Sequence, residues 1–142
     1  MGRILALAGA FALAVVAVPA RGDEPAAAQP PLEGTTWTLV EVGGEPAVAL
    51  PDDRRAELVL DAAGRKLAGS SGCNRLVGGY ELSAQGLRFG AVASTKMACA
   101  EPLMKQEQML EAALRATTGY RIRGRALELR DGARVLARLE AR

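Results

Sequence analysis

The residues of this chain that could carry chemistry gather in two short segments, Gly69–Tyr80 and Thr95–Cys99. The first five residues of Gly69–Tyr80 resemble a nucleophile elbow, except that Cys73 replaces the final glycine. Gly64–Ser71 has the glycine spacing of a phosphate-binding loop, but Ser70 stands where that loop needs lysine. The chain has no histidine, which removes the Ser-His and Cys-His arrangements of nucleophilic catalysis. We therefore expect neither catalysis nor cofactor binding here.

A serine–lysine pair is the remaining nucleophilic arrangement, and its local candidate is Lys96, close to Ser94 and Thr95. Strand alternation places Thr95 and Lys96 on opposite faces, so we expect no catalytic residues. Asn74 tolerates left-handed backbone and is expected to stabilise a turn. Arg75 is either a surface charge or the partner of a carboxylate. Asn74, Arg75, Thr95 and Lys96 are therefore predicted to make structural or partner contacts.

Cys73 and Cys99 are the two cysteines of the chain. As a metal site they would lack two further ligands, so no metal is expected. Free buried thiols would suit a cytosolic protein, whereas a disulfide suits an exported one. We favour a disulfide, which would stabilise the fold by roughly 3 kcal/mol through loop closure. Two reduced, separately packed cysteines remain the alternative.

The N-terminus has the pattern of a secretory signal. Residues 1–20 combine a short basic start, an uncharged run rich in Ala, Leu and Val, and small residues at Val18-Pro19-Ala20. An uncleaved anchor is the alternative, but the run is shorter than the ~20 residues that a spanning helix needs. Residues 21–31 form a Pro- and Ala-rich flexible linker, and residues 32–142 the folded domain. We expect a periplasmic or secreted protein without a stable membrane anchor after cleavage.

The charge balance argues against nucleic acid as a partner. The formal net charge is only +2, whereas nucleic-acid proteins carry a basic patch with stacking aromatics. Arg121–Arg125 is locally basic, but its arginines alternate with apolar or small residues. We interpret this segment as the solvent-facing side of a strand rather than a polyanion site, and we expect a monomer.

Period-two alternation predicts short strands over most of the domain. In the first of them, Trp37 and Leu39 share one face, and Val40 and Val42 the other. The predicted strands are Thr35–Val42, Ala56–Asp61, Arg65–Ser70, Gly79–Ser83, Leu87–Gly90 (which Ala91–Met97 could extend), Tyr120–Arg123, Ala126–Arg130 and Arg134–Glu140.

Spacing of three and four residues predicts one helix over Glu101–Thr118, with Pro102 in its first turn and Gly119 at its end. We interpret its Leu and Met stripe as core packing, and Glu107 and Glu111 as part of a solvated face. Seven or eight short strands around one helix predict a mainly β fold, a compact barrel or a curled meander.

Read in order, several motifs resemble the META domain (HslJ-like) family. They are Thr36-Trp37-Thr38-Leu39, Gly72-Cys73-Asn74, Gly78-Gly79-Tyr80, Ser94 to Cys99, a helix with Glu107 and Leu110, and Leu127-Glu128-Leu129. The resemblance covers about Leu32 to Leu139. It implies a lipocalin-like β fold with one helix, an association with the bacterial envelope, and links to heat shock and novobiocin resistance. The family has no established catalytic residues. Many members are lipoproteins, whereas this chain lacks a lipidation cysteine.

These expectations lead to two functional hypotheses. The first is a non-enzymatic exported protein of envelope stress or drug tolerance that binds an envelope protein or a small apolar ligand. The second is a periplasmic inhibitor of a hydrolase that presents the glycine-rich segment Gly69–Gly79 as a rigid loop.

Overall fold

The computed structural model describes residue 2 and residues 28–142; apart from residue 2, the predicted signal peptide and most of the predicted linker lie outside the described residues. The described residues form one antiparallel sheet, one short 3-10 turn (Pro51–Asp53) and one long helix, α1 (Glu101–Ala116). The strands are β1 (Thr36–Val42), β2 (Glu45–Pro46), β3 (Glu57–Asp61), β4 (Lys66–Ser70), β5 (Arg75–Ser83), β6 (Gly86–Ser94), β7 (Gly119–Arg123), β8 (Ala126–Asp131) and β9 (Arg134–Ala141).

The sheet is a curled meander. Its strand order is β6-β5-β4-β3-β1-β9-β8-β7, with β2 paired to β1 alone. The mainly β class with one helix is confirmed; among the described residues β2 brings the count to nine strands, above the seven or eight predicted. At Gly86, where β6 begins with a φ of +127°, an added Cβ would collide with the carbonyl oxygen of Thr118, just before β7. The two end strands therefore approach each other at this corner.

The core lies on the concave face of the sheet. Trp37 and Leu39 are buried there, as the alternation predicts, and the Trp37 indole donates to the carbonyl of Leu32 at 2.9 Å. Val42 is also buried, although the predicted alternation placed it on the opposite face. The register with β9 shifts between Leu39 and Glu41, and this bulge turns Val42 inward.

Strand β5 is longer than predicted, and β6 includes part of the possible extension Ala91–Met97; each runs nine residues. Their register shifts between Gly78 and Tyr80, where Gly90 and Ala91 lie opposite Gly79. The extra residue breaks the period of two, so the sequence pattern indicated only the part of β5 beside the hairpin turn and left the continuation of β6 open.

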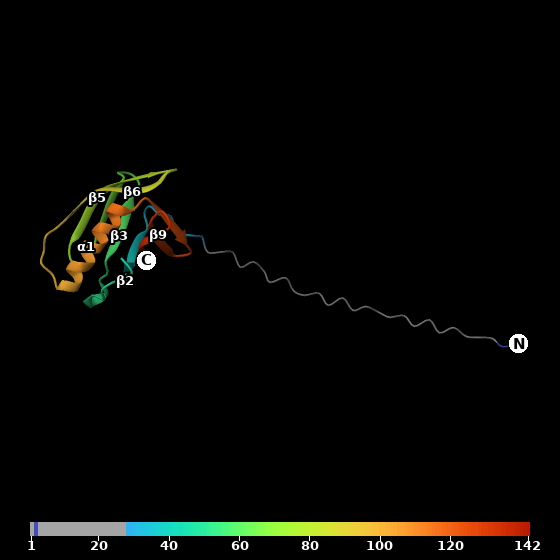
Figure 1. The fold of residues 1–142 in the computed structure, drawn as a ribbon, viewed down its shortest axis with the longest axis horizontal. Helices are drawn as coiled ribbons and strands as arrows, with labels where there is room; N and C mark the ends of the chain where they lie inside the picture. Colours follow the sequence, from blue (N-terminus) through green and yellow to red (C-terminus); the bar gives the residue numbers. More distant parts are fainter. Residues whose placement is uncertain (1, 3–27) are drawn as a thin grey trace.

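Helix α1 packs against the concave face and lies across the sheet in Figure 1. Pro102 occupies its first turn, as predicted, but the helix ends at Ala116 because Thr117 is already extended. Leu110 and Leu114 are fully buried, which confirms the core role of the apolar stripe. Among the described residues, no helix has the length and apolar character needed to cross a membrane.

Charged side chains form a row across the outer face of β7, β8, β9 and β1. Register pairs Arg121 with Glu128, Glu128 with Arg138, and Arg138 with Glu41. Arg138 is ion-paired to Glu41 at 2.7 Å and to Glu128 at 3.6 Å. The arginines of β7 are therefore exposed on a solvent-facing strand surface, as predicted for this segment.

Candidate functional site

The glycine-rich stretch forms a tight bend between β4 and β5. Gly72 has a φ of +96°, and an added Cβ would lie 3.2 Å from side-chain atoms of Leu103 and Leu50. A larger residue would strain the backbone and push the bend away from the helix. Cys73 and Cys99 form the predicted disulfide, with a Cα–Cα distance of 6.0 Å. The bond joins the bend to the segment that leads into α1.

Glu107 lies beneath this bend, with 5 % of its surface exposed. Its Oε2 accepts from the Ser71 hydroxyl at 2.5 Å, and its Oε1 accepts from the Asn74 amide at 3.1 Å. The sequence interpretation of Glu107 as a solvated residue is therefore wrong. A buried carboxylate needs polar partners, and the bend supplies them.

Asn74 is the centre of the same network and is buried. Its Oδ1 accepts from the Met97 N–H at 2.8 Å and the Thr95 hydroxyl at 2.9 Å, and its Nδ2 donates to the Met97 carbonyl at 3.2 Å. Asn74 and Thr95 thus hold the segment after β6 against the bend. Arg75 is exposed, and within residues 28–142 no carboxylate lies at ion-pair distance from it.

Gln106 belongs to this network, although the sequence interpretation did not single it out. Its Oε1 accepts from the Val48 N–H at 2.6 Å, and its Nε2 donates to the Ser71 carbonyl at 2.7 Å. One signal could have found it: Gln106 lies four residues before Leu110 and therefore on the core face of α1.

Lys96 reaches back along the end of β6. Its ammonium donates to the Ser94 hydroxyl at 2.9 Å, and that hydroxyl donates to the Glu111 carboxylate at 3.0 Å. Lys96 is exposed and acts here as a donor, whereas a serine–lysine nucleophile needs the lysine as an acceptor. The arrangement links Lys96, through Ser94, to Glu111 of α1.

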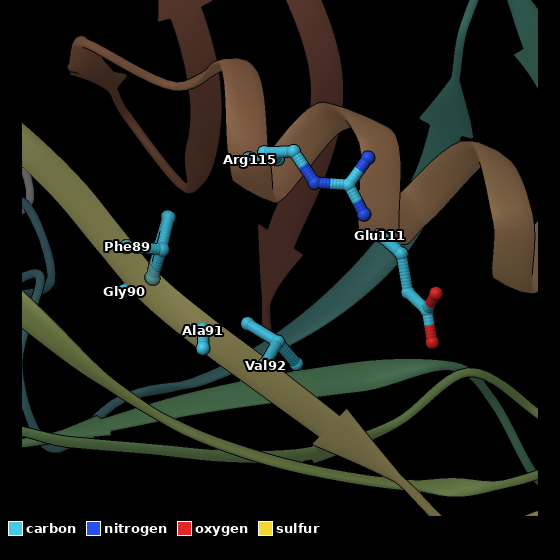
Figure 2. A pocket seen from close by; sticks show the side chains of 6 residues that line it. All are labelled: Phe89, Gly90, Ala91, Val92, Glu111 and Arg115. Atoms are coloured by element: carbon cyan, nitrogen blue, oxygen red, sulfur yellow. The ribbon is translucent and has the colours of Figure 1, made fainter.

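A groove opens between β6 and α1, next to these residues. Its volume is about 300 Å³, and we call it the β6–α1 groove. Figure 2 shows Phe89 and Val92 projecting from β6 towards the helix, with Arg115 and Glu111 extending from α1. Gly90 and Ala91 complete its lining. The groove joins an apolar floor to one cation and one carboxylate, a combination that suits an amphipathic ligand.

A second hollow, of about 450 Å³, lies beside Arg65, Tyr80 and Arg88. The Tyr80 hydroxyl donates to Glu33 at 2.6 Å, and Arg65 is ion-paired to the same oxygen at 2.9 Å. Burial, the hydrogen bond to Glu33 and the charge of Glu33 raise the pKa of Tyr80 to about 12, and Arg65 opposes them only in part. These bonds fasten the start of the domain to β5, so Tyr80 and Arg65 have a structural role beside this hollow.

The fold and the groove define a small antiparallel β domain curled around a single helix and open along one side. The META domain family matches residues 30–142, so the chain belongs to that family. The similarity starts at the end of the predicted linker and includes every strand described above.

Solved structures share this fold. One, a protein structure determined by NMR, is 23% identical with a TM-score of 0.61, and the similarity covers 77% of this chain and 91% of that one. Another, an NMR structure of a protein from Burkholderia xenovorans, is 28% identical with a TM-score of 0.58, and the similarity covers 88% of this chain and 99% of that one. No curated protein is significantly similar to this chain.

Proposed function

We propose that this chain is an exported, non-enzymatic binding protein that uses the β6–α1 groove as its binding site. The observation that carries the proposal is the composition of the groove. Phe89 and Val92 form its floor, and Arg115 extends over it without a carboxylate at ion-pair distance among the described residues. An apolar surface next to a cation that makes no ion pair attracts an apolar ligand or partner with an acidic group.

The proposed biological role is tolerance of envelope stress, including heat and novobiocin-type drugs. Membership of the META domain family supports this role, because the family resemblance links members to both conditions. The disulfide is consistent with an oxidising compartment such as the periplasm, where such bonds persist.

A strain from which the gene has been deleted tests this role. We expect it to survive heat and novobiocin less well than the parent, and the full-length chain to restore survival. A chain starting at residue 28 and made in the cytoplasm should not restore it. A deletion strain as resistant as its parent to both treatments would contradict the proposed role.

Inhibition of a hydrolase receives less support. Ser71 and Asn74 point their side chains into the buried network, so the glycine-rich bend has few groups left for an enzyme cleft. A hydrolase recovered from periplasmic extract in equimolar complex with the chain would favour the inhibitor hypothesis.

A further inference from the structure

We propose that the ligand of the β6–α1 groove is an extended peptide segment with an acidic group, and that it pairs with the free edge of β6 as an added strand. This inference rests on the function proposed above and narrows its ligand to a peptide.

The first argument is the free backbone of β6. This strand ends the sheet and pairs with β5 alone among the described strands. The Thr95 N–H donates to the Arg75 carbonyl at 3.1 Å, so these two residues form a hydrogen-bonded pair of the ladder. Pairs alternate along an antiparallel ladder, so the N–H and C=O groups of Val92 and Ser94 point away from β5. A strand laid along this edge would satisfy them.

The second argument is that this free edge and the groove coincide. Val92 presents its backbone groups to the edge and its side chain to the groove floor, where Phe89 joins it. At about 300 Å³ the groove is at the small end of ligand sites, so it holds one anchoring side chain better than a whole drug-sized molecule. Backbone pairing would supply the remaining affinity, as in other cases of strand addition.

The third argument is charge. Arg115 from α1 and Lys96, two residues after the end of β6, place two cations beside the edge, against the single carboxylate of Glu111. The Ser94 hydroxyl already donates to Glu111, which leaves Arg115 to bind a ligand carboxylate. Arginine can bind a carboxylate through two parallel hydrogen bonds, so an acidic side chain or a peptide C-terminus fits here.

The bulge in β6 argues for a short peptide rather than a second copy of the chain. Gly90 and Ala91 lie opposite Gly79 and interrupt the regular ladder in the middle of the strand. Bulges of this kind oppose edge-to-edge pairing of two long strands. The bulge divides the edge into two short regular parts, Gly86–Phe89 and Val92–Ser94, and the part that borders the groove, Val92–Ser94, suits a few residues of extended peptide.

The test selects peptides from a displayed library of random 12-residue sequences for binding to residues 21–142 of the chain. The affinities of the selected peptides are then measured. We expect them to alternate apolar residues and to carry an acidic group. Val92→Pro removes the outward N–H without touching the ladder to β5, and proline is tolerated at such edge positions. We expect it to weaken binding roughly tenfold or more, whereas Val92→Thr, which keeps the N–H, should weaken it by less than about threefold.

N-methylation of alternate peptide bonds in the selected peptides repeats the test from the ligand side, so the result does not depend on the folding of Val92→Pro. We again expect roughly tenfold weaker binding in one of the two methylation registers. A library that yields no peptide preferring wild type over Val92→Pro overturns the inference, and so do peptides that bind regardless of methylation. If Val92→Pro restores stress tolerance in the deletion strain but Arg115→Glu does not, the groove function stands and the peptide inference fails.

Discussion

Gln106 and Gln108 lie two positions apart on α1 and have opposite surroundings. Gln106 is 3 % exposed and bonds two backbone groups, from Val48 and Ser71, whereas Gln108 is exposed. We expect Gln106→Ala to lower the free energy of unfolding by about 2–3 kcal/mol, because it leaves both partners buried and unpaired. Gln108→Ala should change it by less than about 0.5 kcal/mol. Urea denaturation measures both, and equal effects would contradict the buried network.

The ionisation of the Glu128 carboxyl makes the free energy of unfolding depend on pH. Burial opposes its ionisation, but the hydrogen bond and charge of Arg130, with the charges of Arg138 and Arg121, outweigh burial and lower the pKa of this carboxyl below its ordinary value of 4.5. Because the folded pKa is depressed, the resulting stabilisation is fully present above pH 4.5 and is lost as the pH falls through the folded pKa.

Urea denaturation of wild type and Glu128→Gln between pH 6 and pH 3, a range of about three units around that ordinary value, tests this prediction. We expect the two curves of stability against pH to converge as the pH falls. Glu140→Gln, at an exposed carboxylate 4.0 Å from Arg125, is the control and should leave the slope close to that of wild type. Parallel curves for wild type and Glu128→Gln would refute the role of Glu128.

The contacts of some single residues could be inferred from the sequence, and those of others could not. The sequence correctly indicated the disulfide. It gave Asn74 a local turn role, whereas its side chain bonds Met97 and Thr95 in the segment after β6. It misplaced Glu107, because glutamate on a helix is usually solvated and the partners that stabilise it, Ser71 and Asn74, come from a distant bend. Such a pairing becomes visible only when the bend and the helix are in contact.

At the scale of elements, the disulfide ties the bend before β5 to the segment before α1. The cysteines are 26 positions apart, and in the loop-closure account a crosslink of this span stabilises a fold by about 3 kcal/mol. We expect the Cys73→Ala/Cys99→Ala variant to melt roughly 10 °C or more below wild type. Calorimetry with and without reductant provides the control: reductant should lower the wild-type midpoint and leave the variant unchanged. A wild-type midpoint insensitive to reductant would argue against a stabilising disulfide.

Most elements followed from periodicity, including β8 and β9, whose ladder has a register shift between Leu129 and Arg130. Alternation located β3, β4, β7, β8 and β9 to within about one residue of their observed ends, and the apolar stripe located α1. It placed Val42 of β1 on the wrong face, and it missed Arg75–Gly78 of β5, because the side chains beyond a bulge change faces.

At the scale of the whole molecule, the β6–α1 groove is a product of topology. It exists because the sheet ends at β6 and because α1, which follows β6 in the chain, folds back beside that strand. No motif in the sequence marks Phe89, Val92 and Arg115 as neighbours. The groove could therefore be found only after the order of the strands was known.

The central claim, that this groove is the binding site, is tested most directly by the survival of the deletion strain carrying Arg115→Glu or Arg54→Glu. Both arginines are exposed, and both changes reverse one charge, but Arg54 lies in the segment before β3 and does not line the groove. With equal amounts of each protein in the cells, we predict that Arg54→Glu restores survival of heat and novobiocin to the wild-type level and that Arg115→Glu does not. Equal restoration by both variants would contradict the account.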